Sequence, residues 1–438
     1  MHAGLYRTIW RWHFYAGLFV VPFILILAIT GTIYLFKPDL DRWEERGFRS
    51  RGATGSVSAD AQLAAVLAAH PSARWQSYRL PERVGDAAVI RVATASGQTR
   101  DVYVSPQGRV LATVDPARRI SAWIGDLHGS LLAGAAGRLL VELAASWAIV
   151  LLLTGLFLWW PRGRGPAGVI WPRLNRGIRA ALRDLHAVTG FWVSGLALVL
   201  LLTALPWTDA WATAFRAVRA ELGWVREAQQ WKGGVTLHAA HHPATAHHPP
   251  IADTALAGTP PLPLSVIVAR ASREAMPAPA VLLPPHAPQP FGPPNGPDWK
   301  LTSQTQNRPQ IRSVSFDATS GAVTGRQDFA DKHPIDQVIG IGIAWHEGQL
   351  FGRINQAIGV LTAIGLMTLA VTGTWTWWRR RPAGSGLGAP PAWRGDVRQR
   401  GAIMAIAGLG LLLPMLGASL LAILAGEAAW RRWLSPAP

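Results

Sequence analysis

The chain has 438 residues, of which 50% are hydrophobic and only 15% are charged. The apolar residues collect in runs of about 20 or more, the length that a helix needs to cross a hydrocarbon core of roughly 30 Å, so the composition predicts a polytopic membrane protein. The chain contains no cysteine, which excludes disulfides, thiolate-ligated iron–sulfur clusters and c-type haem attachment.

Five membrane spans are predicted from these runs, at residues 14–36, 138–160, 187–207, 354–378 and 402–426. The first run is too long and too polar at its flanks for a cleaved signal peptide, so we expect a retained helix. Arginine-rich short segments stay on the cytoplasmic side, which predicts that location for the N-terminal stub, the 161–186 loop and the 379–400 loop. This bias accounts for much of the net charge of +17 and leaves no reason to expect a nucleic-acid partner.

The predicted fold class is therefore an α-helical membrane bundle with two small α+β domains outside it. In chain order we expect the stub and first span (1–36), the first outer domain (37–127), an outer interfacial turn and the second span (128–160), a cytoplasmic loop (161–186), the third span (187–207), the second outer domain (208–345), an outer turn and the fourth span (346–378), a second cytoplasmic loop (379–400), and the fifth span with a short tail (401–438).

The first outer domain begins with a predicted helix over 58–70, which is rich in alanine and leucine behind a possible serine or aspartate cap. Short β-branched stretches follow at 74–80, 87–94 and 99–104, and a turn at 106–109 precedes a further strand. This pattern is typical of a small α+β domain.

The second outer domain repeats this ending, with a strand over 313–317 and a turn before 322–325, and its helix is predicted at 264–274. A proline-rich stretch, 277–297, is expected to be an extended loop. An insertion before the helix carries five histidines: His238, His241, His242, His247 and His248. Such tracts bind transition metals loosely, so a metal-collecting loop and a linker without a role both fit.

Four other histidines lie at matching positions in two copies of one unit. His13 and His186 are each followed by a glycine at +4, Gly17 or Gly190, and by a threonine at +17. His128 and His346 are each followed at +26 and +27 by Thr-Gly and at +31 and +32 by Trp-Trp. The chain is therefore a tandem duplication in which both copies keep the same histidines.

Ionisable residues that recur at the ends of membrane spans are usually functional. Neutral imidazole is a common axial ligand of iron, and the topology predicts an inner pair, His13 with His186, and an outer pair, His128 with His346. Nearby glycines, such as Gly134 and Gly352 after the outer pair, would allow close approach of helices or of a flat macrocycle. The alternative is that each histidine is an interfacial residue with its polar edge at the headgroups.

Arginines near these positions are candidates for contacts with haem propionates: Arg11 and Arg183 for the inner pair, Arg138 and Arg353 for the outer pair. For Arg11 and Arg183 a simple topology signal fits equally well. Glu142, one turn after Arg138, is predicted to be the ion-pair partner of that arginine.

Several of these motifs together resemble a known family. They are Tyr103-Val104-Ser105-Pro106 with Gly108 and Val110, Asp126-Leu127-His128-Gly129, Thr154-Gly155 before Trp159-Trp160-Pro161-Arg162, Arg11-Trp12-His13, and Asp184-Leu185-His186. Over roughly residues 5–380 the chain resembles the PepSY-associated transmembrane family, and within it is similar to inner-membrane ferric-siderophore reductases of the FoxB type. The resemblance implies PepSY-like periplasmic domains, two b-type haems, a bacterial inner-membrane location and a role in iron uptake.

The sequence thus favours an oxidoreductase that carries electrons through haem from a cytoplasmic or quinol donor to a ferric siderophore or another ferric chelate outside. No phosphate loop or dinucleotide motif is found, so NADPH or flavin would belong to a partner. Two other classes remain open. The outer domains could form a non-redox binding or sensor module anchored by the spans, or the repeats could form a siderophore or metal transporter.

Overall fold

The computed structural model describes residues 3–49, 55–161, 167–224, 262–289, 293–381, 387–391 and 400–434. The chain forms two compact units, each built from segments that alternate along the sequence. The helical unit comprises Met1–Leu35, Gly125–Val218 and Arg353–Pro438, and the sheet unit comprises Phe36–Ile124 and Arg219–Gly352. Most of the predicted histidine-rich insertion lies outside the described residues, and so do its five histidines.

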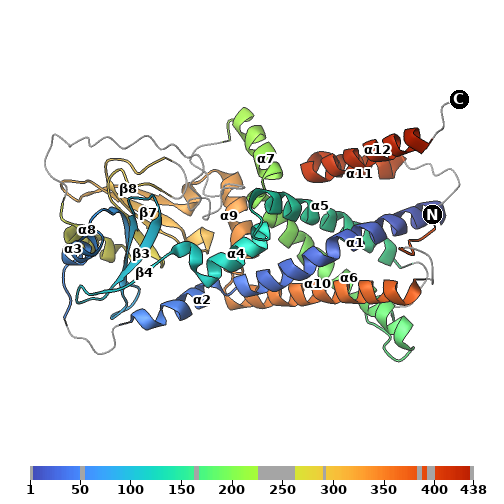
Figure 1. Cartoon of the computed structure of the whole chain (residues 1–438), viewed down its shortest axis with the longest axis horizontal. Helices are drawn as coiled ribbons and strands as arrows, with labels where there is room; N and C mark the ends of the chain where they lie inside the picture. Colours follow the sequence, from blue (N-terminus) through green and yellow to red (C-terminus); the bar gives the residue numbers. More distant parts are fainter. Residues whose placement is uncertain are drawn as a thin grey trace. The chain divides into compact units, whose positions relative to one another are not determined.

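The helical unit is built on four long helices, α1 (Ala3–Tyr34), α5 (Gly134–Trp159), α6 (Ile178–Ala204) and α10 (Arg353–Arg380). Among the described residues these four are long and apolar enough to cross a membrane, and they correspond to the first four predicted spans. Each of α1 and α6 packs against both α5 and α10, so α1 and α6 occupy diagonal positions in a four-helix bundle (Figure 1).

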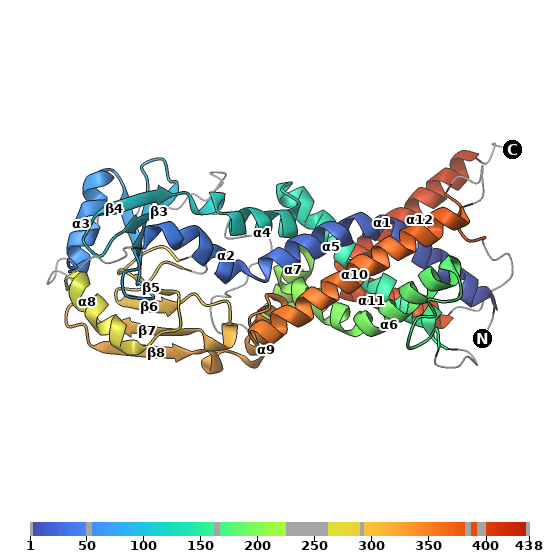
Figure 2. The same cartoon turned by 90° about the horizontal axis from the view of Figure 1, so that it is seen from below.

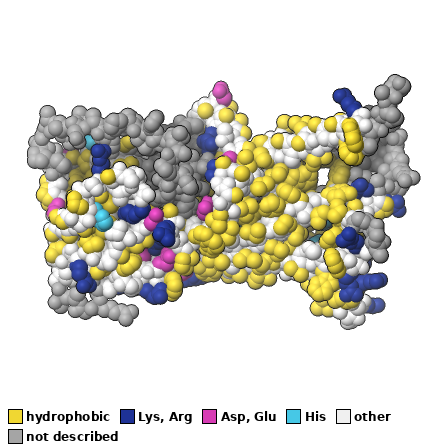
Figure 3. Space-filling model, viewed as in Figure 1, with side chains coloured by type: hydrophobic (Ala, Val, Ile, Leu, Met, Phe, Trp, Pro, Cys, Tyr) yellow, Lys and Arg dark blue, Asp and Glu magenta, His cyan; other side chains and the backbone are white. Residues whose placement is uncertain are grey.

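Large apolar side chains cover the outside of this bundle. Figure 3 shows a continuous belt of hydrophobic side chains over these helices, with lysines and arginines gathered toward the end where the chain termini lie. Leu361 and Ile364 of α10 and Trp192 of α6 are each at least half exposed. An apolar surface of this extent requires a nonaqueous environment, as expected of a multi-pass membrane protein.

The predicted fifth span, 402–426, is not one continuous helix. The helix α11 (Arg400–Leu412) ends before Leu413, and α12 (Pro414–Leu434) begins with Pro414, whose missing N–H suits the first position of a helix. Leu413 and Leu416 are buried against residues that include Ile149 of α5. Neither α11 nor α12 is among the four helices long and apolar enough to cross a membrane, so the fifth span stays a prediction and its continuity was wrong.

The sheet unit contains one antiparallel sheet of eight strands in the order β4-β3-β2-β1-β5-β6-β7-β8. The strands are β1 (Arg74–Arg79), β2 (Ala88–Ala93), β3 (Thr99–Val104), β4 (Val110–Val114), β5 (Ala280–Leu283), β6 (Trp299–Ser303), β7 (Arg312–Phe316) and β8 (Val323–Asp328). The predicted strands are present, but the prediction of an extended loop over 277–297 was wrong in part, because this stretch contains the buried strand β5. The two predicted α+β domains are not separate, because β1 pairs with β5 through Tyr78 opposite Leu282 and Arg79 opposite Val281.

Two helices, α3 (Ala59–Ala69) and α8 (Leu264–Ala271), cover one face of this sheet (Figure 2). Alternate residues of the central strands, such as Ile90, Leu282 and Leu301, face these helices and are fully buried. Burial of each such side chain stabilises the fold by about 1.5–3 kcal/mol. These side chains come from both halves of the sheet, so the two halves share this core.

The remaining helices connect the sheet to the long helices. They are α2 (Lys37–Glu44), α4 (Ile120–Ser130), α7 (Ala210–Glu221) and α9 (Pro334–His346), with short 3₁₀ turns η1 (Glu45–Phe48), η2 (Pro116–Arg118), η3 (Leu205–Trp207), η5 (Ser272–Glu274), η6 (Arg308–Gln310) and η7 (Phe329–Asp331). Two of them carry the predicted outer histidines: His128 lies in α4 and His346 is the last residue of α9.

Candidate functional site: paired histidines in the helical bundle

The predicted inner histidines face each other across the centre of the bundle. His13 of α1 and His186 of α6 come from the two diagonal helices, and their ring centres are 6.5 Å apart with the ring planes at 86°. With metal–nitrogen bonds of about 2 Å, two imidazoles on opposite sides of one iron would have ring centres roughly 6.3 Å apart. The observed separation therefore fits one axially ligated iron between the two rings.

Each of these imidazoles has its Nδ1 atom engaged by a neighbouring helix. His13 Nδ1 lies 3.0 Å from Thr154 Oγ1 of α5. His186 Nδ1 lies 3.1 Å from Thr372 Oγ1 and 3.1 Å from the carbonyl oxygen of Leu369, both in α10. A carbonyl only accepts, so Nδ1 of His186 carries the proton and its Nε2 is left as an unprotonated donor atom for a metal.

A glycine beside each threonine lets the imidazole lie against the helix. A Cβ atom at Gly155 would be 3.2 Å from Cε1 of His13, and one at Gly373 would be 3.1 Å from Cε1 of His186. Both distances are shorter than an ordinary van der Waals contact, so the Thr-Gly pairs of the repeat form the surfaces on which the histidines rest.

The glycines named from the sequence have other neighbours. A Cβ at Gly17 or Gly190 would meet a leucine at an ordinary distance, 3.7 Å or 3.5 Å. Gly134 and Gly352 have positive φ angles of 57° and 58° and begin or precede a long helix, so their role is in the turn rather than in an approach to histidine.

His128 repeats the inner arrangement at the other end of α1. Its Nδ1 lies 3.0 Å from Oγ1 of Thr30, and a Cβ at the adjacent Gly31 would be 3.0 Å from its Cε1. His13 and Thr30 are 17 residues apart on α1, which at 1.5 Å per residue is about 26 Å. The two levels are thus separated by nearly the thickness of a hydrocarbon core.

The fourth histidine, His346, belongs to the sheet unit and is half buried at the end of α9. Its pairing with His128 stays a prediction. A buried polar cluster that the sequence did not reveal is next to it in the chain: Glu347 lies 3.8 Å from Arg308, and its Oε2 has no hydrogen-bond partner among the described residues. Burial raises the pKa of Glu347, and the cations Arg308 and Lys37 oppose that rise.

The arginines predicted for the inner pair have protein partners. Arg11 donates to the carbonyl of Pro390 at 3.1 Å and to the hydroxyl of Tyr15. Arg183 donates to Asp184 at 2.7 Å, and Asp184, which is 1% exposed, also accepts from Arg173. These bonds hold both arginines near the start of their helices, and propionate contacts remain predictions.

The arginines predicted for the outer pair also have protein partners. The prediction that Glu142 pairs with Arg138 was wrong. Arg138 donates to Asp209 at 2.9 Å, whereas the buried Glu142 accepts the backbone N–H groups of Ala210 and Trp211, each at 2.8 Å. Glu142 therefore satisfies the first turn of α7, where a carboxylate also complements the helix dipole. Arg353 donates to Gln356 at 3.0 Å.

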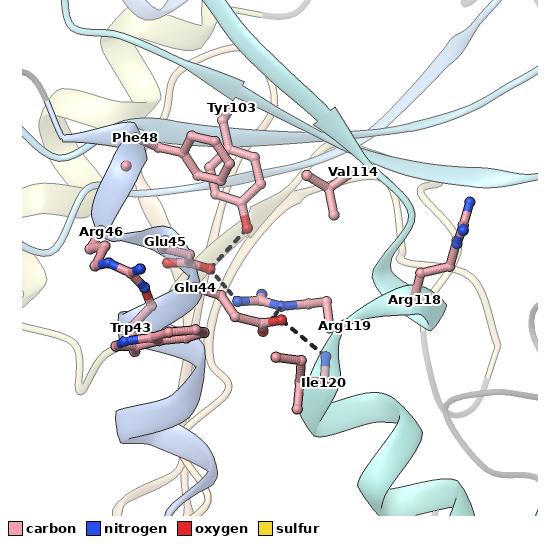
Figure 4. A pocket seen from close by; sticks show the side chains of 11 residues that line it. Trp43, Glu44, Glu45, Arg46, Phe48, Tyr103, Val114, Arg118, Arg119 and Ile120 are labelled. Carbon is pink, nitrogen blue, oxygen red and sulfur yellow. Dashed lines mark hydrogen bonds and ion pairs between the residues drawn. The ribbon is translucent and has the colours of Figure 1, made fainter.

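A pocket in the sheet unit lies beside the start of α4 (Figure 4). Its volume is about 450 Å³. Arg119 bridges Glu44 and Glu45 at 3.3 and 2.9 Å, and Glu44 also accepts the N–H of Ile120 at 3.0 Å. Tyr103 donates to Glu45, and burial raises the pKa of that tyrosine. Both glutamates are thus used internally, and the cluster anchors the N-terminus of α4.

Among the described residues, no group of three or more histidine, cysteine, aspartate or glutamate side chains is placed to hold a metal ion. The paired histidines are therefore the candidate metal ligands in the part of the chain that the structure describes.

A comparison with protein families decides the relationship. The model of the PepSY-associated TM region matches residues 10–380. The chain belongs to this family. No curated protein matches the chain at a significant level. The matched residues of the PepSY-associated TM region include all four repeated histidines and the three Thr-Gly pairs behind them. The sequence analysis used these Thr-Gly pairs as signs of duplication and of family resemblance, but it did not predict that Thr154 and Thr372 contact histidines.

Proposed function

We propose that this protein is a haem-b-containing transmembrane electron conduit that reduces a ferric chelate, such as a ferric siderophore, on the periplasmic side of the inner membrane. The observation that carries the proposal is the pair His13 and His186, whose ring centres are 6.5 Å apart across the bundle. Zinc or another metal is a weaker fit, because no third ligand side chain accompanies the pair among the described residues.

A bound haem would supply a reversible one-electron carrier at each level. The residues of the chain have separate roles: His13 and His186 would be the inner axial ligands, and His128 and His346 the outer ones. Two histidines for each iron leave no free coordination position, so a ferric chelate would be reduced without binding to the iron. The levels, about 26 Å apart along α1, are spaced to connect the two faces of a membrane.

The assignment of the acceptor rests on the resemblance to ferric-siderophore reductases and on the chemistry of release. Ferrous iron is held less tightly than ferric iron by hard oxygen chelators, so reduction frees the metal. The arginine-rich ends of α1, α6 and α10 support a cytoplasmic location for that end of the bundle. A cytoplasmic or quinol donor would then deliver electrons at the His13 level.

The test is a pair of absorption spectra, oxidised and dithionite-reduced, of the full chain purified in detergent, with a haem-to-protein ratio. We expect about two b-type haems per chain and reoxidation of the reduced protein when a ferric hydroxamate or catecholate chelate is added. The variant His70→Ala is a control and should keep its haem. His70 also contacts a threonine, Thr113, at 3.0 Å, but it lies in the sheet unit. Protein without haem, or haem that ferric chelates cannot oxidise, would contradict the proposal and favour a binding module.

A further inference from the structure

We propose that Thr30, Thr154 and Thr372 are positioning residues whose hydroxyl oxygens hold the histidine imidazoles with Nδ1 protonated and Nε2 free, and that they thereby set the reduction potentials of the two levels. This inference rests on the proposed function. It concerns residues of the chain itself, and the contacts that support it are visible without a cofactor.

The hydroxyl group of each threonine is committed as a donor within its own helix. Thr30 donates to the carbonyl of Ile26 at 2.7 Å, and Thr154 donates to that of Val150 at 2.8 Å. Thr372 donates to the carbonyl of Thr368 at 2.6 Å. A hydroxyl has one hydrogen, so toward histidine each of these oxygens acts as an acceptor. The histidine must then supply the proton from Nδ1, and this is the tautomer in which Nε2 can bind a metal.

The same contact occurs three times in different helices. The distances from Nδ1 to the threonine oxygen are 3.0 Å for His128, 3.0 Å for His13 and 3.1 Å for His186. Each threonine is followed by a glycine against which the ring lies. Two other threonines of these helices, Thr32 in α1 and Thr362 in α10, also donate to their own helix backbone but have no histidine contact among the described residues. Helical back-bonding alone therefore does not explain the contact.

An acceptor at Nδ1 makes the imidazole a stronger electron donor through Nε2, which stabilises the ferric state. Removal of that acceptor should raise the reduction potential. If the ferric-to-ferrous equilibrium shifts by about tenfold, the change for one electron is about 59 mV. The affected level should depend on the threonine: Thr154 and Thr372 act on the inner histidines, and Thr30 acts on an outer one.

The experiment is a redox titration of Thr154→Val, Thr372→Val and Thr30→Val, followed by haem absorbance. We expect the potential of one haem to rise in Thr154→Val and in Thr30→Val while the other haem stays at its original potential, and Thr→Ser at the same position should restore it. Thr372→Val should have a smaller effect, because the carbonyl of Leu369, 3.1 Å from Nδ1 of His186, remains as an acceptor. The matched controls are Thr32→Val and Thr362→Val, which remove a hydroxyl from the same helices without a histidine contact. Potentials unchanged in all three variants, or changed equally in the controls, would overturn the inference.

A second measurement separates this inference from the proposed function. Histidine labelled with ¹⁵N reports the protonated ring nitrogen in the protein before haem is added. We expect His13 to be protonated at Nδ1 in the parent protein and in Thr154→Ser. This preference should weaken in Thr154→Val, where the backbone of Leu151 is left as the hydrogen-bond partner of the imidazole. If the purified parent binds no haem, the proposed function fails, but the tautomer result still decides the role of the threonine. An Nε2-protonated His13 in the parent would overturn the inference alone.

Discussion

Asp60 of α3 accepts the backbone N–H of Leu264, the first residue of α8, at 2.7 Å, and its second oxygen accepts from Ser265 at 3.0 Å. A side chain from the first repeat thus caps a helix of the second. Removal of a capping side chain typically costs about 1 kcal/mol. We expect Asp60→Ala to lower the free energy of unfolding of the sheet unit by roughly this amount, as measured by thermal or urea unfolding. Asp60→Asn, which keeps one acceptor, should lose less.

The same cap predicts a dependence on pH. Burial acts to raise the pKa of Asp60, but the hydrogen bonds from Ser265 and from the N–H of Leu264 outweigh it and lower that pKa. A carboxyl whose pKa is lower in the folded state contributes stability above its unfolded pKa and loses it as pH falls through the folded pKa. The difference in stability between the parent and Asp60→Ala should therefore be full at pH 7 and shrink below about pH 4. A difference that grows in acid would contradict the assignment.

Loss of either inner histidine should remove the same haem. We expect His13→Ala and His186→Ala each to reduce the haem content from about two to about one per chain, and the double variant to lose no more, since both ligands serve one site. Combining His13→Ala with His128→Ala should leave none. The measurement is a haem-to-protein ratio with the reduced absorption spectrum. Equal, additive losses in the inner double variant would mean that His13 and His186 belong to different sites.

Substitution of the glycine that lies against a histidine should have opposite effects on the stability of the protein and on its retention of haem. In Gly373→Ala the new Cβ would lie 3.1 Å from Cε1 of His186, so the imidazole must move by a few tenths of an ångström. Alanine is the better helix former by about 1 kcal/mol. We expect the thermal stability of the haem-free protein to stay the same or rise, while haem dissociates faster. The control is Gly195→Ala in α6, where no atom lies within 4 Å of the added Cβ.

A buried ion pair at the start of α9 should be far more sensitive than an exposed one. Arg219 has 0% exposure and binds both oxygens of Asp336 at 2.8 Å. Removal of one partner leaves a buried charge, so Asp336→Ala should destabilise the sheet unit by about 3–5 kcal/mol. The matched control is Arg312→Ala, whose exposed pair with Asp328 at 2.9 Å should contribute less than about 1 kcal/mol. Equal effects in denaturant unfolding would contradict the prediction.

The sequence was most informative where a signal is local or duplicated. Long apolar runs predicted α1, α5, α6 and α10, because crossing a membrane requires a continuous helix. Duplication predicted that His13 and His186 would meet, since equivalent helices occupy equivalent places in the bundle. The break between α11 and α12 was not predicted, because Leu413 and Pro414 do not interrupt the run of apolar residues.

Contacts between distant segments were not predictable in the same way. Glu142 was assigned to Arg138 because the two are four residues apart, yet the carboxylate gains two backbone hydrogen bonds at the start of α7 instead. The threonine contacts were missed because they join helices that meet only in the folded bundle. The pairing of β1 with β5 was missed because β5 lies within the proline-rich stretch 277–297, which was predicted to be an extended loop rather than a strand.

The central position of β1 has a consequence for the making of the protein. Its partner β5 begins about 200 residues after β1 ends, and α5 and α6 lie between them in the chain. At 5–20 residues per second, a ribosome needs roughly 10–40 s to deliver β5. During that time the first meander has finished its own pairing but presents an open strand edge, which other chains can join. The nascent chain therefore needs the free edge of β1 to be protected until β5 has been synthesised.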